Sequence, residues 1–299
     1  MLVVFNPAAG ARRRRRLARA LGILSGAGIL ARVAETRHPG HATLLARDAA
    51  GAGVPIVVAA GGDGTIAEVA AGLAGSAARL GILPFGTANV LAWELGLPAR
   101  PETAAAVLAG GRAARLWPGR ARFGDGHERL FVQMLGAGFD AQVVARLDLG
   151  LKRRLGRAAY VLQGLRELGR YRFPRFTAVL DGEAIEVAGA IISKGRLYAG
   201  RHLLAPAALP GDAGFQVALF RGGGAWRAAL QGAALPLDLL PRLPGVELRR
   251  AGRVVLAALP QGGAVPVQAD GDPAGLLPVT VEDAPGPLWV MLPAGQGPG

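Results

Sequence analysis

Cysteine is absent from this chain of 299 residues, which excludes disulfides, thiolate metal sites and a catalytic thiol. Histidine is scarce, and the spacing of its four positions does not fit a helical metal site: they are His38, His41, His127 and His202. Long apolar runs are missing too, and the first residues form no basic leader, so neither a membrane-spanning helix nor a secretory signal is predicted. We therefore expect a cytoplasmic protein whose membrane contact is peripheral, on the inner face.

Lysine is nearly absent as well, because Lys152 and Lys194 are the only lysines among 34 basic residues. The formal net charge of +13 favours binding to anions such as nucleic acid, an anionic lipid surface or a phosphorylated substrate. A GC-rich genome produces the same arginine-rich composition, so both explanations stay open. Aromatic residues make up only 5% of the chain and are not interleaved with basic ones, so we expect no nucleic-acid partner.

Two basic runs are candidates for docking on an anionic membrane: residues 12–16, and the group Lys152, Arg153, Arg154 and Arg157. A solvated helix face is an equally good interpretation of either run. The sequence predicts no oligomeric state.

Strands and helices alternate in the first 118 residues. The predicted strands are residues 2–5, 29–36, 55–60 and 80–83, and the predicted helices are 12–24, 41–50, 65–74, 88–95 and 101–109. Because alternating strands and helices form parallel sheets covered on both faces, we expect an α/β domain here.

Beyond about Pro118 the pattern changes to hairpins. Strands are predicted at residues 120–123, 130–134, 177–180, 185–192, 214–220, 246–259, 265–269, 278–281 and 288–292, with helices at 151–168 and 226–239. This half is typical of an antiparallel sandwich or barrel. The predicted organisation is therefore an α/β domain over residues 1–118, a β-rich domain over 119–293 and a tail over 294–299.

The strongest motif is Gly61-Gly62-Asp63-Gly64-Thr65, which lies between a buried strand and a helix. Such a turn directs backbone N–H groups and the positive end of the helix dipole at one spot, where a phosphate fits. Glycine permits both a close approach and a positive φ, and Asp63 would sit beside the phosphates to bind a metal or water. A tight turn without a ligand is the alternative.

Two other nucleotide-binding motifs do not explain this sequence. The P-loop pattern is absent. Gly62-x-Gly64-x-x-Ala67 fits the loose dinucleotide fingerprint, but it follows the third strand and lacks an acid about 20 residues later.

Two further strand ends carry polar, glycine-containing turns, Asn6-Pro7-Ala8-Ala9-Gly10 and Gly86-Thr87-Ala88-Asn89. Thr87 could hold a nucleotide, although capping of the next helix is favoured. The carboxyl ends of parallel strands share one edge of a sheet, where ligands of open α/β folds bind.

These three motifs resemble the diacylglycerol kinase catalytic domain, especially the bacterial soluble lipid kinases, which are also similar to sphingosine kinases. Gly-Gly-Asp-Gly is shared with NAD kinases and phosphofructokinases, whereas Gly86-Thr87-Ala88-Asn89 is more specific. The resemblance implies an NAD kinase-like α/β nucleotide domain followed by a β-rich lipid-binding sandwich. It also implies ATP, Mg²⁺ and a lipid substrate, diacylglycerol or a related lipid, which is phosphorylated on a hydroxyl at the membrane surface.

The resemblance also assigns residues. The ATP site would comprise Asn6, Pro7, Ala8, Ala9, Gly10, Thr36, Gly61, Gly62, Asp63, Gly64, Thr65, Ile66, Ala67, Glu68 and Thr87. Leu209, Asp212 and Gly214 would hold Mg²⁺, with backbone carbonyls from the non-acidic members. Asp272 would be the general base, and Asp63 would orient metal or water.

Several positions depart from the family pattern. Asp272 stands where Glu is usual, so Asp270 is an alternative base, and a hairpin turn without catalysis is another interpretation. The remaining departures are Ala67 for Asn, Val90 for Asp, Ala213 for Gly, and Ala11 for a basic residue that Arg12 or Arg13 could replace. An NAD kinase-like enzyme and an inactive nucleotide- or membrane-binding regulator therefore remain alternatives.

Overall fold

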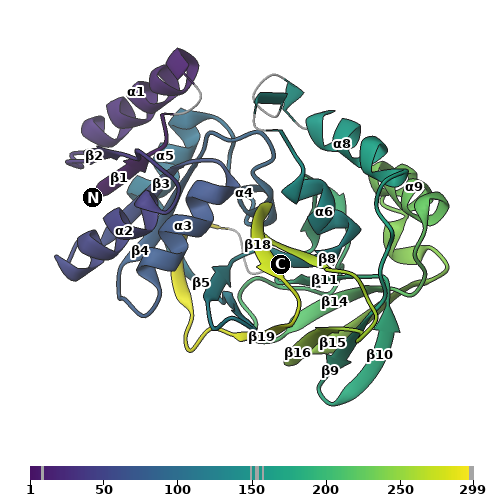
Figure 1. Cartoon of the computed structure of the whole chain (residues 1–299). Helices are drawn as coiled ribbons and strands as arrows, with labels where there is room; N and C mark the ends of the chain where they lie inside the picture. Colours follow the sequence, from purple (N-terminus) through teal and green to yellow (C-terminus); the bar gives the residue numbers. More distant parts are fainter. Residues whose placement is uncertain (8–9, 149, 152–154, 157, 296–299) are drawn as a thin grey trace. The chain divides into compact units, whose positions relative to one another are not determined.

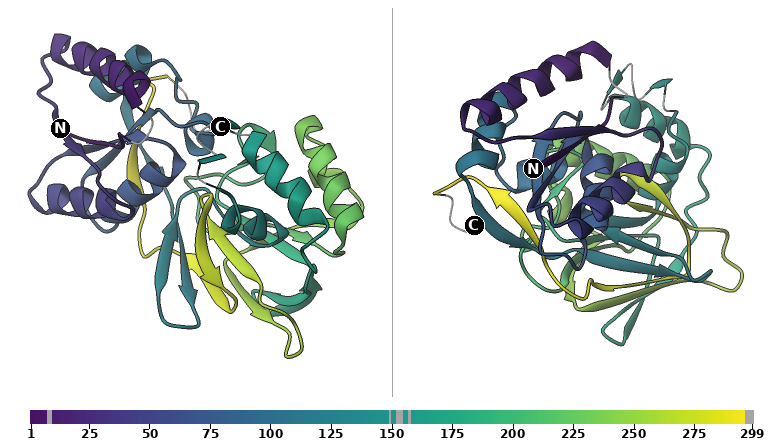
Figure 2. Two further views of the ribbon diagram at one scale, coloured as in Figure 1. Left: turned by 45° about the horizontal axis from the view of Figure 1, so that its top comes forward. Right: turned by 90° about the vertical axis from the view of Figure 1, so that its left-hand side faces the viewer.

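The structure is a computed structural model that describes residues 1–7, 10–148, 150–151, 155–156 and 158–295. The chain forms two compact units, Met1–Trp117 with Pro285–Gly299, and Pro118–Ala284, which Figures 1 and 2 show from three directions. Some predicted residues lie outside the described part: Ala8 and Ala9 of the nucleotide set, and Lys152, Arg153, Arg154 and Arg157 of the second basic group.

The first unit is built on one six-stranded sheet in the order β2-β1-β3-β4-β20-β5. Its strands are β1 (Leu2–Phe5), β2 (Arg32–Glu35), β3 (Ile56–Gly61), β4 (Arg79–Pro84), β5 (Arg112–Leu116) and β20 (Leu288–Leu292). The first four strands and β20 are parallel, and β5 runs antiparallel to β20. The predicted parallel α/β sheet is confirmed.

Two pairs of helices cover this sheet, one pair on each face (Figure 2). Helices α1 (Gly10–Gly26) and α5 (Pro101–Gly110) pack together, and α2 (His41–Gly51) packs on α3 (Asp63–Leu73). Leu17 and Leu24 of α1 meet Val58 and Leu83 of the sheet in a buried core. A short helix, α4 (Val90–Glu94), follows β4.

Strand β20 differs from the prediction, which placed residues 288–292 in the second domain. It lies between β4 and β5, with Trp289 beside Arg79 and Val290 beside Leu80. The strand itself was predicted at these residues, but pairing between positions about 200 residues apart leaves no mark in the local pattern.

The second unit is a sandwich of two antiparallel six-stranded sheets with the orders β10-β9-β16-β19-β6-β7 and β15-β14-β11-β8-β17-β18. The strands are β6 (Gly119–Phe123), β7 (Glu128–Phe131), β8 (Met134–Gly138), β9 (Phe176–Leu180), β10 (Glu183–Val187), β11 (Gly189–Ser193), β14 (Phe215–Phe220), β15 (Val246–Ala251), β16 (Arg253–Ala258), β17 (Pro266–Ala269), β18 (Asp272–Leu276) and β19 (Val279–Asp283). A small hairpin pairs β12 (Leu197–Tyr198) with β13 (His202–Leu203). Both sheets bury aromatic side chains in one core, among them Phe131, Phe176 and Phe215. This confirms the predicted antiparallel sandwich.

Three of the predicted strands are each divided in the structure. The runs 130–134, 185–192 and 246–259 become β7 with β8, β10 with β11, and β15 with β16. At each break, such as Ala188 or Gly252, the chain passes from one sheet to the other. Both sheets face the same core, so the run remains apolar where the chain crosses between them. The break between the two strands is therefore not visible in the hydrophobic pattern.

Helices of the second unit are α6 (Phe139–Ala145), α8 (Ala158–Leu168) and α9 (Ala225–Ala234), followed by the short turns η1 (Leu235–Leu237) and η2 (Leu240–Arg242). Helix α6 was not predicted, because its seven residues are too few to display a helical period. Within the described residues, no helix combines the length and the apolar character needed to cross a membrane.

Candidate functional site

Three turns of the first unit meet at the carboxyl edge of its parallel sheet. Asn6 follows β1 and donates its backbone N–H to Ala60 of β3 at 3.2 Å, and its side-chain Nδ2 lies 3.3 Å from Thr65 Oγ1. Phe85, which follows β4, donates its backbone N–H to Gly61 at 2.8 Å. The sheet therefore brings the three predicted nucleotide motifs together.

Glycine is required here because the turns approach backbone to backbone. A Cβ added to Gly86 would lie 2.4 Å from the Cα of Gly62 and 2.6 Å from Asn89 Oδ1, closer than real Cβ atoms come. The prediction that the motif also needs a positive φ is wrong for Gly62, whose φ is −97°. Close approach, not left-handed backbone, explains this glycine.

Asp63 joins two of these turns. Its carboxylate accepts the backbone N–H groups of Asn89 at 2.8 Å and Val90 at 2.6 Å, and so caps helix α4. Burial raises the pKa of Asp63, and these backbone hydrogen bonds oppose the rise. Both carboxylate oxygens thus hold protein amides, in contrast to the metal- or water-binding role that the sequence suggested.

Thr87 is not the cap of the following helix, although capping was the favoured interpretation. The N-cap residue of α4 is Asn89, in left-handed backbone at φ 50°, and Thr87 lies exposed before it. Asp63 caps α4 in its place, because the turn that contains Asp63 packs directly against the loop between β4 and α4.

Several other predicted nucleotide residues have structural partners. Glu68 accepts the backbone N–H groups of Gly40 at 2.9 Å and Ala42 at 3.1 Å, at the start of α2. Ile66 and Ala67 are buried within the first unit. Pro7 and Thr36 are half-buried at the same sheet edge, where the Thr36 N–H donates to Phe5 at 2.9 Å, and Gly10 begins α1.

Two features of this edge remain available for a ligand. The first amide of α3 to bond within the helix is that of Ile66, which donates to the Gly62 carbonyl at 3.0 Å, so the first-turn amides of Gly64 and Thr65 have no acceptor within the helix. Asn89 Oδ1 is buried without a hydrogen-bond partner. Asn89 belongs to the Gly86-Thr87-Ala88-Asn89 motif, but the sequence did not predict a place for it in the nucleotide site.

In the second unit, the two candidate bases lie in the β17–β18 hairpin, Asp270 in its turn and Asp272 at the start of β18. Asp270 and Gly271 have φ of 50° and 83°, as a type I′ hairpin turn requires. Asp270 is buried, and its carboxylate accepts the N–H groups of residues Val132, Gln133 and Met134 at 2.7, 2.8 and 3.0 Å. The Asp272 side chain is 41% exposed and lies 3.8 Å from Arg129 Nη2.

A partly buried chain of polar side chains is hydrogen-bonded to this turn. Gln268 accepts the Gly271 N–H at 2.8 Å through Oε1 and donates through Nε2 to Asp140 Oδ2 at 2.9 Å. Tyr198 donates its hydroxyl to the other oxygen of Asp140. Burial raises the pKa of both Asp140 and Tyr198. This set was not predicted, because its members lie on three separate segments: the β17–β18 hairpin, α6 and β12.

Asp270→Asn is expected to destabilise the second unit by roughly 2–4 kcal/mol, because an amide cannot accept all three of these backbone hydrogen bonds. Thermal or urea unfolding measures the loss. Asp272→Asn is the matched control and should unfold as wild type does, since its side chain is open to solvent. Equal stability of the two variants would contradict a structural role for Asp270.

The predicted magnesium ligands do not fit a metal in this structure. The Leu209 carbonyl accepts the Asp212 N–H at 3.0 Å, and the Gly214 carbonyl accepts Lys194 Nζ at 2.8 Å. Across the described residues, no cluster of three His, Cys, Asp or Glu side chains could hold an ion. No catalytic step is therefore assigned to a metal in this loop.

Comparisons with known proteins identify the family. Residues 1–121 match the sequence model of the diacylglycerol kinase catalytic domain, and residues 133–292 match that of the YegS C-terminal NAD kinase beta sandwich-like domain. The chain is 33% identical to "Probable lipid kinase YegS-like" from Pseudomonas putida, over 93% of this chain and 90% of that protein. The chain belongs to the YegS-like lipid kinase family.

Other relatives agree with this assignment. A protein of the same name from Stenotrophomonas maltophilia is 31% identical, over 92% of this chain and 91% of that protein. The crystal structure of a diacylglycerol kinase from Bacillus anthracis has a TM-score of 0.70 at 17% identity, and a second structure from that organism has 0.78 at 19%; each covers 97% of this chain and 96% of its own. At such identities the structures establish the fold alone.

Proposed function

We propose that this chain is an ATP-dependent lipid kinase, which transfers the γ-phosphoryl group of ATP to the hydroxyl of diacylglycerol or a related lipid. The observation that carries the proposal is the close packing of Gly62 on Gly86 at the edge where α3 begins. Together with the family assignment, this packing favours a phosphate-binding edge over a simple turn.

Each residue of this edge has a proposed task. The first-turn amides of Gly64 and Thr65, with the positive end of the α3 dipole, bind phosphate oxygens. Asn6 orients the Thr65 hydroxyl through the 3.3 Å contact of its side chain. Asn89 Oδ1, which lacks a protein donor, accepts a hydrogen bond from the nucleotide. Gly62 and Gly86 keep the backbone open to this approach.

The transfer replaces one phosphorus–oxygen bond with another. The lipid hydroxyl oxygen bonds to the γ-phosphorus, the bond to the bridging oxygen breaks, and ADP leaves. Asp272 accepts the hydroxyl proton as general base, since its carboxylate is open to solvent and that of Asp270 is engaged by three amides.

Transfer of labelled γ-phosphate to a panel of lipids tests the proposal. The panel contains diacylglycerol, monoacylglycerol, ceramide, sphingosine and phosphatidylglycerol, with NAD as the soluble acceptor. Labelled lipid with unlabelled NAD supports a lipid kinase. Label on NAD alone favours the NAD kinase-like alternative, and ATP binding without any labelled acceptor favours an inactive regulator.

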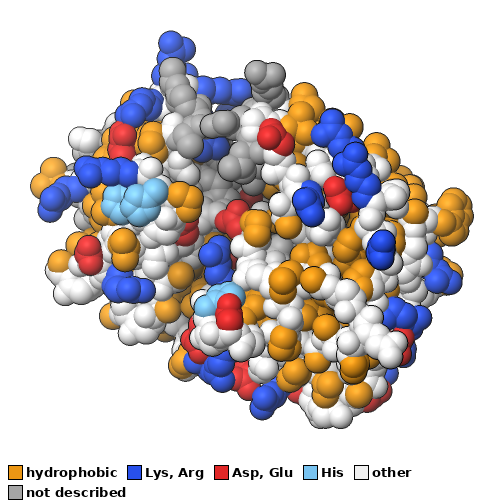
Figure 3. Space-filling model, viewed as in Figure 1, with side chains coloured by type: hydrophobic (Ala, Val, Ile, Leu, Met, Phe, Trp, Pro, Cys, Tyr) orange, Lys and Arg blue, Asp and Glu red, His pale blue; other side chains and the backbone are white. Residues whose placement is uncertain are grey.

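Helix α8 has polar side chains on its buried face and apolar ones on its exposed face. Gln163 and Glu167 are buried and bonded to each other at 2.9 Å, whereas Val161 and Leu165 are 65% and 63% exposed. On the neighbouring α9, Trp226 is 76% exposed. Figure 3 shows arginine and apolar side chains intermixed where Figure 1 places these helices.

We propose that this α8–α9 surface docks on an anionic membrane, where the lipid substrate lies. The exposed Arg166, Arg170 and Arg227 supply charge of the right sign beside the apolar side chains. In the predicted arginine run 12–16, two side chains have partners within the first unit: Arg14 pairs with Glu35, and Arg16 donates to the Ala99 carbonyl at 2.7 Å. That run therefore contributes less.

The double variant Val161→Glu, Leu165→Glu should reduce binding to phosphatidylglycerol vesicles by about 10-fold or more, because burial of each side chain in the membrane is worth roughly 1.5–3 kcal/mol. Vesicle co-sedimentation measures the bound fraction. Leu30→Glu, which changes a leucine that is 90% exposed in the first unit, is the matched control and should bind as wild type does. Undiminished binding of the double variant, or equal wild-type binding to neutral vesicles, would end the docking proposal.

A further inference from the structure

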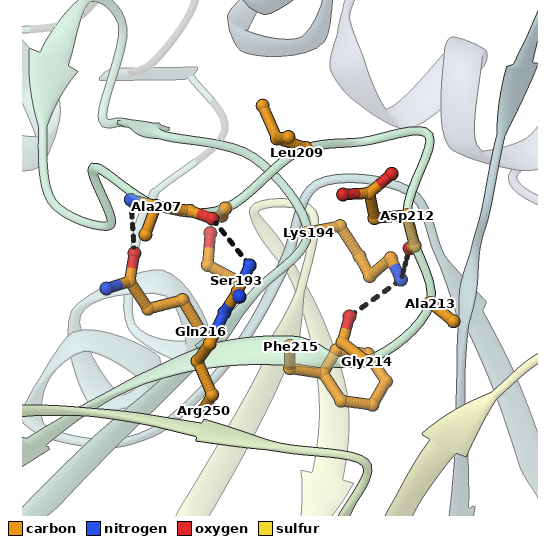
Figure 4. A pocket seen from close by; sticks show the side chains of 11 residues that line it. Ser193, Lys194, Ala207, Leu209, Asp212, Ala213, Gly214, Phe215, Gln216 and Arg250 are labelled. Carbon is orange, nitrogen blue, oxygen red and sulfur yellow. Dashed lines mark hydrogen bonds between the residues drawn. The ribbon is translucent and has the colours of Figure 1, made fainter.

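The loop that carries the predicted magnesium ligands already holds a cation supplied by the chain. Lys194 follows strand β11, and its side chain has no exposed surface. Its Nζ donates to the carbonyl oxygens of Asp212 and Gly214, each at 2.8 Å, and to Asp283 Oδ1 at 2.8 Å. Figure 4 shows the ammonium group between the two carbonyls, among the residues that line a small pocket.

The hydrogen bonding of this ammonium is complete. A lysine ammonium has three N–H donors, and here each has its own oxygen acceptor. The ring of Phe215 lies 4.9 Å from Nζ and adds a cation–π contact. The second oxygen of Asp283 accepts the Gly214 N–H at 2.6 Å, so the carboxylate joins the cation to the loop backbone.

The environment of Lys194 acts on its pKa in opposite directions, and the net effect is a lowered pKa. Burial lowers the pKa of Lys194, and the hydrogen bond and charge of Asp283 raise it. The ion pair and the two carbonyls together compensate the loss of hydration that an isolated buried ammonium would suffer.

The oxygen set around Nζ is of the kind that hard divalent cations take, two backbone carbonyls and one carboxylate. A Mg²⁺ ion bound to these oxygens would have to displace Nζ, and it would meet the positive charge of the lysine at short range. The carboxylate of Asp212, the acidic ligand of the predicted site, is exposed and points away from Nζ in Figure 4.

We propose that the ammonium of Lys194 replaces a divalent cation in the loop 209–214, so that the chain itself closes this loop and no Mg²⁺ binds there. The proposal concerns ion binding to the second unit, and it holds whether or not the protein phosphorylates lipids. It predicts that the loop oxygens form a latent cation site, which appears when the lysine charge is removed.

The first experiment uses the wild-type protein without nucleotide. Its unfolding temperature should be the same in EDTA and in 10 mM MgCl₂ or CaCl₂, and equilibrium dialysis with Mn²⁺ should give the same binding for wild type and Asp212→Asn. The Asp212 carboxylate is exposed, so this variant keeps its fold. Mn²⁺ binding to wild type that is lost in Asp212→Asn would overturn the proposal.

The second experiment removes the internal cation. Lys194→Ala should lower the unfolding temperature by at least about 6 °C, because the half-buried Asp283 loses its ion-pair partner and the two loop carbonyls lose their donor. Addition of 10 mM Ca²⁺ or Mn²⁺ should restore about 3 °C or more, since metal now occupies the vacated oxygens. The double variant Lys194→Ala, Asp283→Asn should lose this recovery.

Two further variants complete the design. Arg242→Ala removes an exposed positive charge from the same unit and should show neither the loss nor the metal response. Lys194→Gln removes the charge but keeps a donor, and it serves if the alanine variant does not fold. A Lys194 variant that is destabilised but does not respond to metal would overturn the proposal, because its loop would then be no cation site.

Discussion

Asp272→Asn is expected to bind ATP as wild type does and to lose turnover by at least about 100-fold, the lower end of what a positioned general base contributes. Asparagine has the same shape but cannot accept the proton of the lipid hydroxyl. The Asp272 side chain is exposed and lies 3.8 Å from Arg129, and such an exposed ion pair contributes little to stability. A loss of turnover in this variant could therefore not be explained by unfolding. Turnover is measured with labelled ATP, and ATP binding by calorimetry.

Two variants make this result interpretable. Asp125→Asn removes an exposed carboxylate from another hairpin turn of the same unit and should keep wild-type turnover. Asp272→Glu restores the carboxylate with one additional methylene and should retain most of the activity. If Asp272→Asn turns over within about threefold of wild type, then another group is the base, since a true base contributes far more.

The first sheet was predictable because its signals are local. Strand β3 is a continuous apolar run that ends in glycine, and Asp63 begins a helix directly after it. Each of these features acts over a few residues, so a window of sequence contains all of the cause. The same holds for the carboxyl edge, since any set of parallel strands joined by helices gathers its turns there.

The partners of the acidic residues were not predictable. Asp63 and Glu68 both lie in the nucleotide motif. The Asp63 carboxylate accepts backbone N–H groups at the start of α4, and the Glu68 carboxylate accepts those at the start of α2. From the sequence alone, a carboxylate beside a glycine turn is equally suited to bind a metal, a phosphate-bound water or the N-terminus of a helix. Only the packing of neighbouring turns decides between them, and that packing depends on residues 26 to 28 positions away.

Lys194 illustrates the same limit at longer range. Its acceptors are Asp212 and Gly214, in the loop before β14, and Asp283, at the end of β19 and 89 positions along the chain. The sequence showed that lysine is rare here, but this said nothing about where its charge lies. The predicted magnesium ligands Asp212 and Gly214 use their backbone carbonyls to accept the Lys194 ammonium, which the sequence did not predict.

Gly86→Ala is expected to reduce kcat/KM for ATP by about 100-fold, because a displacement of about 1 Å at a positioning residue has effects of this size. The added Cβ would lie 2.4 Å from the Gly62 Cα, which is backbone, and 2.6 Å from Asn89 Oδ1, whose side chain is held by the hydrogen bond from Nδ2 to the Gly86 carbonyl at 3.0 Å. The two turns must therefore separate, which moves the first-turn amides of α3 away from Asn89 Oδ1. Overpacking should also cost about 1–3 kcal/mol of stability.

The loss of activity in a Gly→Ala variant should depend on how closely the new Cβ approaches its neighbours, not on the loss of a glycine as such. Gly62→Ala brings its Cβ only to 3.3 Å from the Gly86 Cα, so a shift of a few tenths of an ångström relieves it and the activity should fall less. Gly22→Ala, inside α1 with nothing within 4 Å of the new Cβ, should keep full activity and gain roughly 0.4–1 kcal/mol of stability. Assays at a temperature where all three proteins are folded separate catalysis from unfolding. Equal kcat/KM for Gly86→Ala and Gly22→Ala would show that the nucleotide does not use the junction of these two turns.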